Sequence, residues 1–280
     1  MQTIEIVRMK GNHGISCTDE VSVEEPLEIR VSYESEGERH TRNISVTMRT
    51  PGNDAELAIG FLFTEGIISD PQQIKRASHL PAACSVNTGN VITVELADGC
   101  MPQLMNADRN FYTTSSCGVC GKGSIEAIRT VSPFPHTERK KQRVTLGVLY
   151  ELAEELRTFQ NNFSATGGIH ASGLFDTSGH LLIVREDVGR HNALDKLIGS
   201  ALRNGQLPLR EQILVLSGRA SFELIQKAAM AGISAVAAIG APSSLAVELA
   251  KEFDMTLLGF LRDNRFNIYN ESSHIEIITE

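Results

Sequence analysis

Apolar and polar residues alternate at several places in the first hundred positions. Leu27–Val31 and Ile44–Met48 show this period of two, and the run Val91–Leu96 shows a third candidate. Alternation of this kind predicts strands with one buried face. A further strand is expected near Leu104. The first part of the chain is therefore predicted to be rich in strands.

A change to helical spacing interrupts these strands after residue 52. Asn53 is a suitable N-cap, and Glu56 stands three residues later, where a capping box needs an acid. Gly66 is placed to end the helix. The apolar face of the predicted helix consists of Leu57, Phe61 and Leu62.

The second half of the chain alternates strands with helices. Thr145 is expected to cap a first helix, and two short strands at 172–175 and 181–184 then form a hairpin. Apolar runs joined by helices indicate parallel strands buried on both faces. The remaining predicted elements are a helix at 190–202, a strand at 213–216, a helix at 220–231, a strand at 235–239, a helix at 243–253 and a strand at 256–260.

These patterns predict an α/β protein, α+β overall, with two domains. Residues 1–130 form a smaller N-terminal α+β domain rich in strands, and residues 144–280 form an α/β domain with a mixed, partly parallel sheet. Between them, residues 131–143 combine two prolines with a basic run and no periodicity, which is typical of a linker. A chain of 280 residues is long enough for two such domains.

The charge balance limits the classes of partner. The chain has 26 Lys and Arg against 34 Asp and Glu, a formal net charge of -8, so a general nucleic-acid or anionic-membrane surface is excluded. The apolar runs are too short to span a bilayer, and the start of the chain lacks the pattern of a secretory signal. We therefore expect a cytoplasmic protein. Any phosphate group must be held by a local site.

Two of the five cysteines, Cys117 and Cys120, form a C-x-x-C pair in a glycine-rich loop. A structural zinc site needs a second ligand pair at short spacing, and the sequence shows none. A thioredoxin-like motif would start a helix, which the flanking glycines disfavour. Sulfur carriage by a thiolate on a mobile loop beside Lys122 is the third chemistry. Spacing alone leaves zinc, redox and sulfur chemistry open.

Polar loops follow the three predicted parallel strands of the second domain. They are Ser217–Arg219, Gly240–Ser244 and Arg262–Arg265. Because parallel strands end at one edge of a sheet, these loops are expected to lie together and to offer hydroxyls, guanidinium groups and helix N-termini to an anion. Ordinary helix capping is the alternative interpretation. The sequence contains neither a Walker loop nor GxGxxG.

Several motifs together resemble the FdhD family of formate dehydrogenase accessory sulfurtransferases. They are SSCGVCGK at 115–122, TGGIHASG at 166–173, EDVGRHNALDK at 186–196 and LSGRAS at 216–221. FTEG at 63–66 and GFLRDNR at 259–265 extend the likeness to most of the chain. One departure is Asp263, where the family often has glycine.

The resemblance implies a cytoplasmic homodimer with a cytidine-deaminase-like C-terminal domain. It implies that Cys117 carries a persulfide received from a cysteine desulfurase, with Cys120 as its partner. The sulfur would pass to the molybdenum of bis(molybdopterin guanine dinucleotide), which serves formate dehydrogenase, and guanine nucleotides would mimic that cofactor. The expected cofactor-binding residues are Phe260, Leu261, Arg262, Asp263, Asn264 and Arg265, joined by Ser217, Arg219 and Ser243.

The deaminase-like fold does not imply deaminase chemistry, because the H-x-E and P-C-x-x-C signature is absent and Ser116 stands where the proline would be. Two functions of other classes remain open. One is a zinc-stabilised binding module, and the other is a chaperone that shelters the cofactor without sulfur chemistry. The roles of His170 and His191 are not assigned by the sequence.

Overall fold

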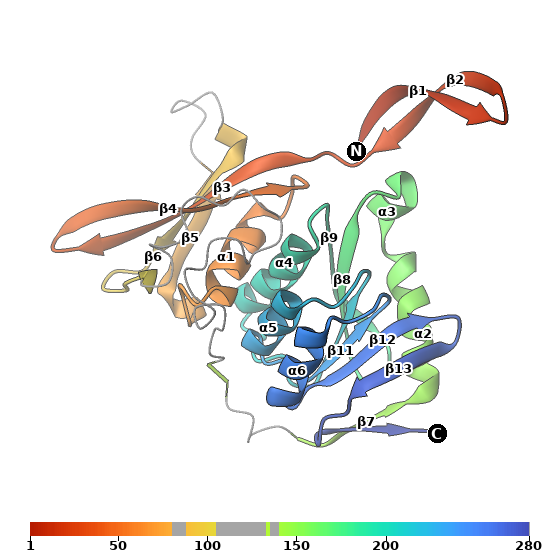
Figure 1. Cartoon of the computed structure of the whole chain (residues 1–280). Helices are drawn as coiled ribbons and strands as arrows, with labels where there is room; N and C mark the ends of the chain where they lie inside the picture. The colour runs from red at the N-terminus through yellow and green to blue at the C-terminus, as the bar shows by residue number, and fades with distance from the viewer. Residues whose placement is uncertain (80–87, 105–132, 135–139, 280) are drawn as a thin grey trace.

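The computed structural model describes residues 1–79, 88–104, 133–134 and 140–279 (Figure 1). Within these ranges, no helix is long and apolar enough to cross a membrane. The predicted Cys117–Cys120 loop lies outside them, as does most of the predicted linker. The last two linker residues, Gln142 and Arg143, already belong to a strand.

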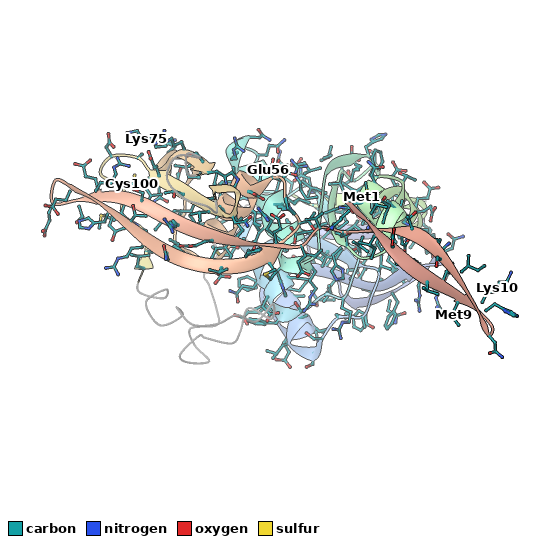
Figure 2. All side chains as sticks on the ribbon, turned by 90° about the horizontal axis from the view of Figure 1, so that it is seen from above. Met1, Met9, Lys10, Glu56, Lys75 and Cys100 are labelled. Atoms are coloured by element: carbon teal, nitrogen blue, oxygen red, sulfur yellow. The ribbon has the colours of Figure 1, made fainter. Side chains whose placement is uncertain are left out.

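A two-stranded hairpin opens the chain and projects from the rest of the molecule (Figures 1 and 2). It consists of β1 (Gln2–Lys10) and β2 (His13–Val21), paired antiparallel along their full length. Most of its residues are exposed. Its side chains therefore contribute little to the core.

The N-terminal sheet has the order β4-β3-β6-β5 and is covered by helix α1 (Asp54–Thr64). Leu27, Ile29 and Val31 of β3 are fully buried against this helix, which confirms the alternation predicted there. The strands are β3 (Glu25–Ser35), β4 (Glu38–Arg49), β5 (Ile74–His79) and β6 (Val91–Leu96), with the short 3-10 turns η1 (Pro71–Gln73) and η2 (Thr88–Asn90).

The alternation predicted for Ile44–Met48 gives a different result. Ile44 is buried, but Val46 and Met48 are 55% and 47% exposed. The pairing of β3 with β4 shifts register between Ile29 and Arg30, so one extra residue is inserted in β4. Such a bulge reverses the side-chain alternation beyond it. Val46 and Met48 therefore lie on the outer face of the sheet.

The capping box predicted at the start of α1 is not formed. Asn53 is the N-cap of α1, but it has a left-handed backbone with φ of 57° and its side chain makes no capping hydrogen bond. Glu56 instead accepts hydrogen bonds from Arg185 at 2.6 and 2.8 Å. Residues 101–104 form no strand, and the positions that follow the predicted strand near Leu104 lie outside the described residues.

The large sheet has the order β13-β12-β11-β10-β8-β9, and its middle strands β10, β11 and β12 are parallel. Strands β8, β9 and β13 run antiparallel to their neighbours, so the sheet is mixed as predicted. The bounds are β8 (His170–Phe175), β9 (Leu181–Asp187), β10 (Ile213–Leu216), β11 (Ala235–Ala238), β12 (Thr256–Arg262) and β13 (Arg265–Asn270).

Helices cover both faces of this sheet (Figure 1). On one face, α4 (Arg190–Arg203), α5 (Phe222–Met230) and α6 (Ser244–Glu252) pack on alternate residues such as Leu214 and Leu216. On the other, α2 (Leu146–Thr158) packs on Ile213 and Val215. This double burial explains why the strands read as continuous apolar runs. The remaining elements are α3 (Asn161–Thr166), β7 (Gln142–Thr145) and β14 (Ile275–Ile278).

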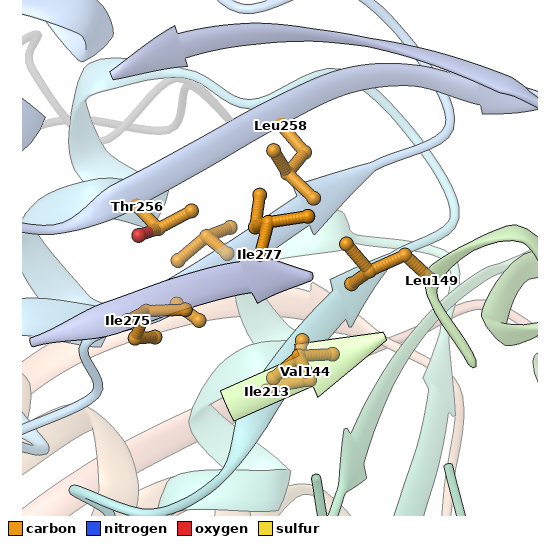
Figure 3. A pocket seen from close by; sticks show the side chains of 9 residues that line it. Val144, Leu149, Ile213, Thr256, Leu258, Ile275 and Ile277 are labelled. Atoms are coloured by element: carbon orange, nitrogen blue, oxygen red, sulfur yellow. The ribbon is translucent and has the colours of Figure 1, made fainter. Parts of the chain in front are cut away.

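A small apolar gap lies between the β7–β14 pair and the large sheet (Figure 3). Its volume is about 10 Å³, and its walls include Val144, Leu149 and Ile275. The polar atom of Thr256 on this wall already accepts a hydrogen bond from the backbone of Ser272. The gap can hold one water molecule at most, and apart from Thr256 its walls have no polar side chain that could bind a ligand.

Helices α1 and α4 cross in close contact and join the two halves of the molecule. A Cβ atom on Gly60 would lie 1.9 Å from the carbonyl oxygen of Asp195, and one on Gly199 would lie 1.9 Å from that of Glu56. Glycine at both positions lets the helix backbones touch. The hydrophobic core is continuous across this contact, which we call the α1–α4 junction.

Candidate functional site

The structure confirms that the three polar loops share one edge of the large sheet. Ser217–Arg219, Gly240–Ser244 and Arg262–Arg265 follow β10, β11 and β12, which are parallel neighbours. The first two loops also contact directly, because the backbone N–H of Gly240 donates to the oxygen of Gly218 at 2.9 Å. We call these loops, together with Phe260 and Leu261, the carboxyl edge.

The two serines predicted at this edge have structural hydrogen bonds. The hydroxyl oxygen of Ser217 accepts from the backbone N–H of Ala171 at 2.8 Å. The hydroxyl oxygen of Ser243 accepts from the N–H of Ala246 at 3.3 Å and so caps α6. Helix capping, the alternative interpretation, therefore accounts for Ser243. Ser217 links β10 to β8.

The segment Phe260–Arg265 has an unusual backbone. Phe260 has a left-handed φ of 56° although it lies within β12, where the pairing with β13 is irregular between Gly259 and Arg262. Its N–H donates to the carbonyl oxygen of Gly240 at 3.1 Å, which ties β12 to the loop after β11. Non-glycine residues with such φ values are uncommon and gather at ligand sites. Leu261 is fully buried beneath the segment.

The tip of this hairpin explains why aspartate is tolerated at position 263. Asp263 and Asn264 have φ values of 53° and 52°, the left-handed pair that a two-residue hairpin turn requires. Glycine, asparagine and aspartate are the residues that adopt this conformation most readily. Asp263 is exposed and makes no hydrogen bond or ion pair with another described residue. Its presence is therefore compatible with the turn.

Arg262 and Arg265 face each other directly across the β12–β13 hairpin. Both side chains are exposed, and neither forms an ion pair with a described carboxylate. Directly opposed like charges destabilise a strand pair. Arg219, exposed on the neighbouring loop, also lacks an ionic partner within the described ranges. An anion held between these guanidinium groups would offset their repulsion.

The predicted catalytic residues Cys117 and Cys120 lie outside the described residues. The described free cysteines are Cys17 on β2 and Cys100, both partly buried. The described residues also contain no group of three or more histidine, cysteine or acidic side chains able to hold a metal. A zinc site built from described side chains alone is therefore not present.

A polar cluster at the same end of the sheet was not placed by sequence reasoning. Strand β8 is antiparallel to β10, so its first residue, His170, lies beside the carboxyl edge. Strand β9 ends there too, with Asp187 opposite His170, and α4 starts three residues later. The polar density at 186–196 was visible in the sequence. Its location depended on the antiparallel pairing of β8, which the motif alone did not reveal.

Burial and hydrogen bonds together set the charges in this cluster. Burial, with Arg190 and His191 nearby, lowers the pKa of His170 from its usual 6.5, so the ring is neutral at pH 7. Burial raises the pKa of Glu223, but His191 and other hydrogen bonds lower it overall to about 2. Glu223 is thus ionised at physiological pH, and its carboxylate lies 3.8 Å from His191 Nε2.

Two buried ion pairs lie behind the cluster, toward the α1–α4 junction. Lys196 contacts Asp187 at 2.7 Å and donates to the carbonyl oxygen of Thr50 at 2.8 Å. Lys227 contacts Asp195 at 3.0 Å, and Asp195 also accepts from Thr64. Burial lowers the pKa of Lys227, but Asp195 and Glu65 raise it overall, so the ammonium stays charged. These contacts therefore link Thr50 and Thr64 of the N-terminal half to α4 and α5 of the second half.

Comparisons with known proteins agree in sequence and in fold. The sequence model of the FdhD/NarQ family matches residues 22–276. Sulfur carrier protein FdhD of Streptomyces coelicolor is 44% identical over 275 residues, covering 98% of this chain and 95% of that protein. The protein of the same description from Mycolicibacterium paratuberculosis is 48% identical over 273 residues, covering 96% and 97%.

The fold has a counterpart among solved structures. A crystal structure described as "a putative formate dehydrogenase accessory protein" from Desulfotalea psychrophila aligns with a TM-score of 0.73. The alignment covers 98% of this chain and 99% of that one, at 23% sequence identity. The mixed α/β architecture is therefore shared. By the family model and its full-length relatives, the chain belongs to the FdhD/NarQ family.

Proposed function

We propose that this protein is a cytoplasmic sulfur carrier that supplies sulfur to a molybdenum cofactor. Its relatives of 44% and 48% identity are described as sulfur carrier proteins, and the chain covers nearly their whole length. The observation that supports a cofactor site is the opposed pair Arg262 and Arg265, which has no anionic partner among the described side chains. An accessory role toward formate dehydrogenase follows from the same resemblance.

Sulfur loading requires a nucleophilic cysteine, and we assign this role to Cys117. Its thiolate attacks the terminal sulfur of a persulfide on a cysteine desulfurase, the sulfur–sulfur bond of that persulfide breaks, and the desulfurase cysteine leaves as a thiolate. The sulfur is then carried as a Cys117 persulfide. Gly118 between the two cysteines, Gly121 after them and the neighbouring Lys122 suit a reactive thiolate. Cys120 is its partner in the loop.

The acceptor is bis(molybdopterin guanine dinucleotide), bound as a substrate at the carboxyl edge. Arg219, Arg262 and Arg265 would bind its phosphates, because guanidinium groups form paired hydrogen bonds with phosphate oxygens. The left-handed backbone at Phe260 positions the segment that carries two of these arginines. A homodimer is part of the proposal, since the family resemblance implies one.

Mass spectrometry tests the loading step. The protein is incubated with a cysteine desulfurase and cysteine, and the expected product carries one added sulfur that is removed by reducing agent. Cys117→Ala should abolish the adduct, whereas the matched control Cys17→Ala, on the projecting β1–β2 hairpin, should retain it. An adduct of unchanged yield in Cys117→Ala would refute the assignment.

The same variants separate the proposal from its rivals. A chaperone without sulfur chemistry predicts that Cys117→Ala and Cys120→Ala still support an active formate dehydrogenase. A zinc-stabilised module predicts stoichiometric zinc that resists a mild chelator.

Binding is tested independently, because Arg262→Ala or Arg265→Ala should weaken affinity for guanosine diphosphate about tenfold or more.

A further inference from the structure

The N-terminal turn of α4 lies at the same end of the sheet as the carboxyl edge. Ser172 pairs with Leu216 in the β8–β10 register, so His170 reaches the loop that follows β10. A Cβ atom on Gly218 would lie 3.3 Å from His170 Nδ1, which places the imidazole directly against that loop. Strand β8 is three positions from β12 in the sheet, a separation of about 14 Å at the usual strand spacing.

Side chains from three elements meet at this turn. His191 of α4 has Nε2 at 3.4 Å from the Ser221 hydroxyl and 3.8 Å from the Glu223 carboxylate. His170 of β8 has Arg190 and His191 near enough to lower its pKa. Glu223 and Ser221 both lie at the same nitrogen of His191, which leaves Nδ1 without a hydrogen-bond partner among the described residues.

Two buried polar atoms in this region have no partner among the described residues. Arg190 Nε is buried and makes no hydrogen bond. Ser172, only 1% exposed and on the same face of β8 as His170, has a hydroxyl without a partner. Buried polar groups are nearly always satisfied, so such orphans indicate a missing ligand or water. Both atoms can donate a hydrogen bond.

The N-terminus of α4 has no side-chain cap of its own, although the buried Asp187 carboxylate accepts from the N–H of Gly189 at 2.9 Å. Its N-cap is Gly189, which has no side chain to cap the helix, and the first turn contains no acidic residue. By contrast, Thr145 and Ser243 cap α2 and α6 with their hydroxyl oxygens. An uncapped helix N-terminus carries partial positive charge and free N–H groups. Arg190 adds a full positive charge at the same place.

The chemistry of these groups favours an anion over the alternatives. The described residues form no cluster of three metal-ligating side chains. A serine–histidine–acid relay needs the acid and the serine on different ring nitrogens, whereas here both lie at Nε2. What remains is a set of donors, namely Arg190, the two imidazoles and the helix N–H groups. The two carboxylates in this region already have partners, since Asp187 is paired with Lys196 and Glu223 lies at Nε2 of His191. Phosphate oxygens match such a set.

We propose that Arg190, His191 and His170 form a second anion subsite that binds a phosphate or diphosphate group, about 14 Å along the sheet from Arg262. Its assignment to the nucleotide part of the cofactor rests on the proposed function. Glu223 fixes His191 through Nε2 and leaves Nδ1 for the anion. A side chain at Gly218 would press on the His170 ring, which would have to shift by a few tenths of an ångström.

Calorimetric titration of the full-length protein tests the subsite. The probes are inorganic pyrophosphate, guanosine diphosphate and, as the ligand without phosphate, guanosine. Arg190→Gln and His191→Gln should each weaken pyrophosphate binding, by about tenfold for the arginine. The matched control is Arg203→Gln, which removes the same charge from the exposed C-terminal end of α4 and should leave binding unchanged. Arg190→Lys should restore part of the affinity.

The outcomes separate the subsite from the proposed function. Unchanged affinity for pyrophosphate and guanosine diphosphate in a folded Arg190→Gln/His191→Gln double variant would overturn the subsite, while weakened binding in Arg262→Ala would still support the cofactor site. Weaker binding of both pyrophosphate and guanosine diphosphate by the double variant supports a nucleotide as the source of the phosphate. Weakening of pyrophosphate alone supports a subsite for a free anion. If Cys117 acquires no sulfur but pyrophosphate binding still depends on Arg190, the proposed function fails and the anion subsite stands.

Discussion

The α1–α4 junction and the carboxyl edge use charged residues in opposite ways. At the junction, Lys196 and Lys227 are buried and each contacts a buried carboxylate. At the edge, Arg262 and Arg265 face each other in solvent without a described anionic partner. Paired, desolvated charges fix how the two halves pack, whereas unpaired exposed charges are available to a ligand. The difference separates residues that fix the packing of the two halves from residues that are free to contact a ligand.

The largest effect is expected at the junction. Lys227→Met leaves Asp195 buried without its cation, and breaking a buried pair in this way costs about 3 to 5 kcal/mol. Urea unfolding should show this loss in the free energy of unfolding. The control is Lys75→Met, which removes an exposed pair with Asp98 and should cost less than about 1 kcal/mol. Equal losses in the two variants would contradict the distinction.

The next effect concerns the helix contact itself. Gly199→Ala places a methyl group 1.9 Å from the Glu56 carbonyl oxygen, so the helices must separate and the loss is about 1 to 3 kcal/mol. Gly147→Ala in α2 is the matched control, because the nearest atom to its new methyl group is 3.8 Å away. That variant should be neutral or gain up to about 1 kcal/mol. Thermal unfolding of both variants measures the contrast.

The smallest effect is a pH dependence close to the edge. The folded-state pKa of Glu223 is lowered from 4.5 to about 2, so its contribution to stability is full above pH 4.5 and is lost as the pH falls toward 2. Glu223→Gln should therefore be less stable than wild type at pH 6, and the gap should narrow at pH 3. Urea midpoints at the two pH values provide the comparison. A gap that widens toward low pH would contradict it.

Much of the second domain could be predicted because its signals are local. The strand Ile213–Leu216 was predicted with its observed bounds, and the convergence of three loops followed from parallel strands. The cap at Thr145 was also confirmed. These features depend on apolar runs and short-range hydrogen bonds. Such patterns can be recognised in a single sequence.

The failures came from long-range pairing. The bulge at Ile44, which reverses Val46 and Met48, depends on how β3 and β4 register with each other. Glu56 does not form the predicted capping box, because its carboxylate pairs with Arg185, 129 residues away. The position of His170 beside Gly218 required the antiparallel pairing of β8 with β10. Sequence periodicity carries no information about any of these partners.

In the proposed function, Cys117 loads the sulfur, and the arginines of the carboxyl edge hold the cofactor that accepts it. Protein carrying radiolabelled sulfur on Cys117 is mixed with cofactor and formate dehydrogenase, and the label transferred to the cofactor is counted. The Arg262→Ala/Arg265→Ala double variant should load as much sulfur as wild type but transfer little of it. The control Arg203→Ala should load and transfer sulfur as wild type does. Equal transfer by the double variant and wild type would contradict the account.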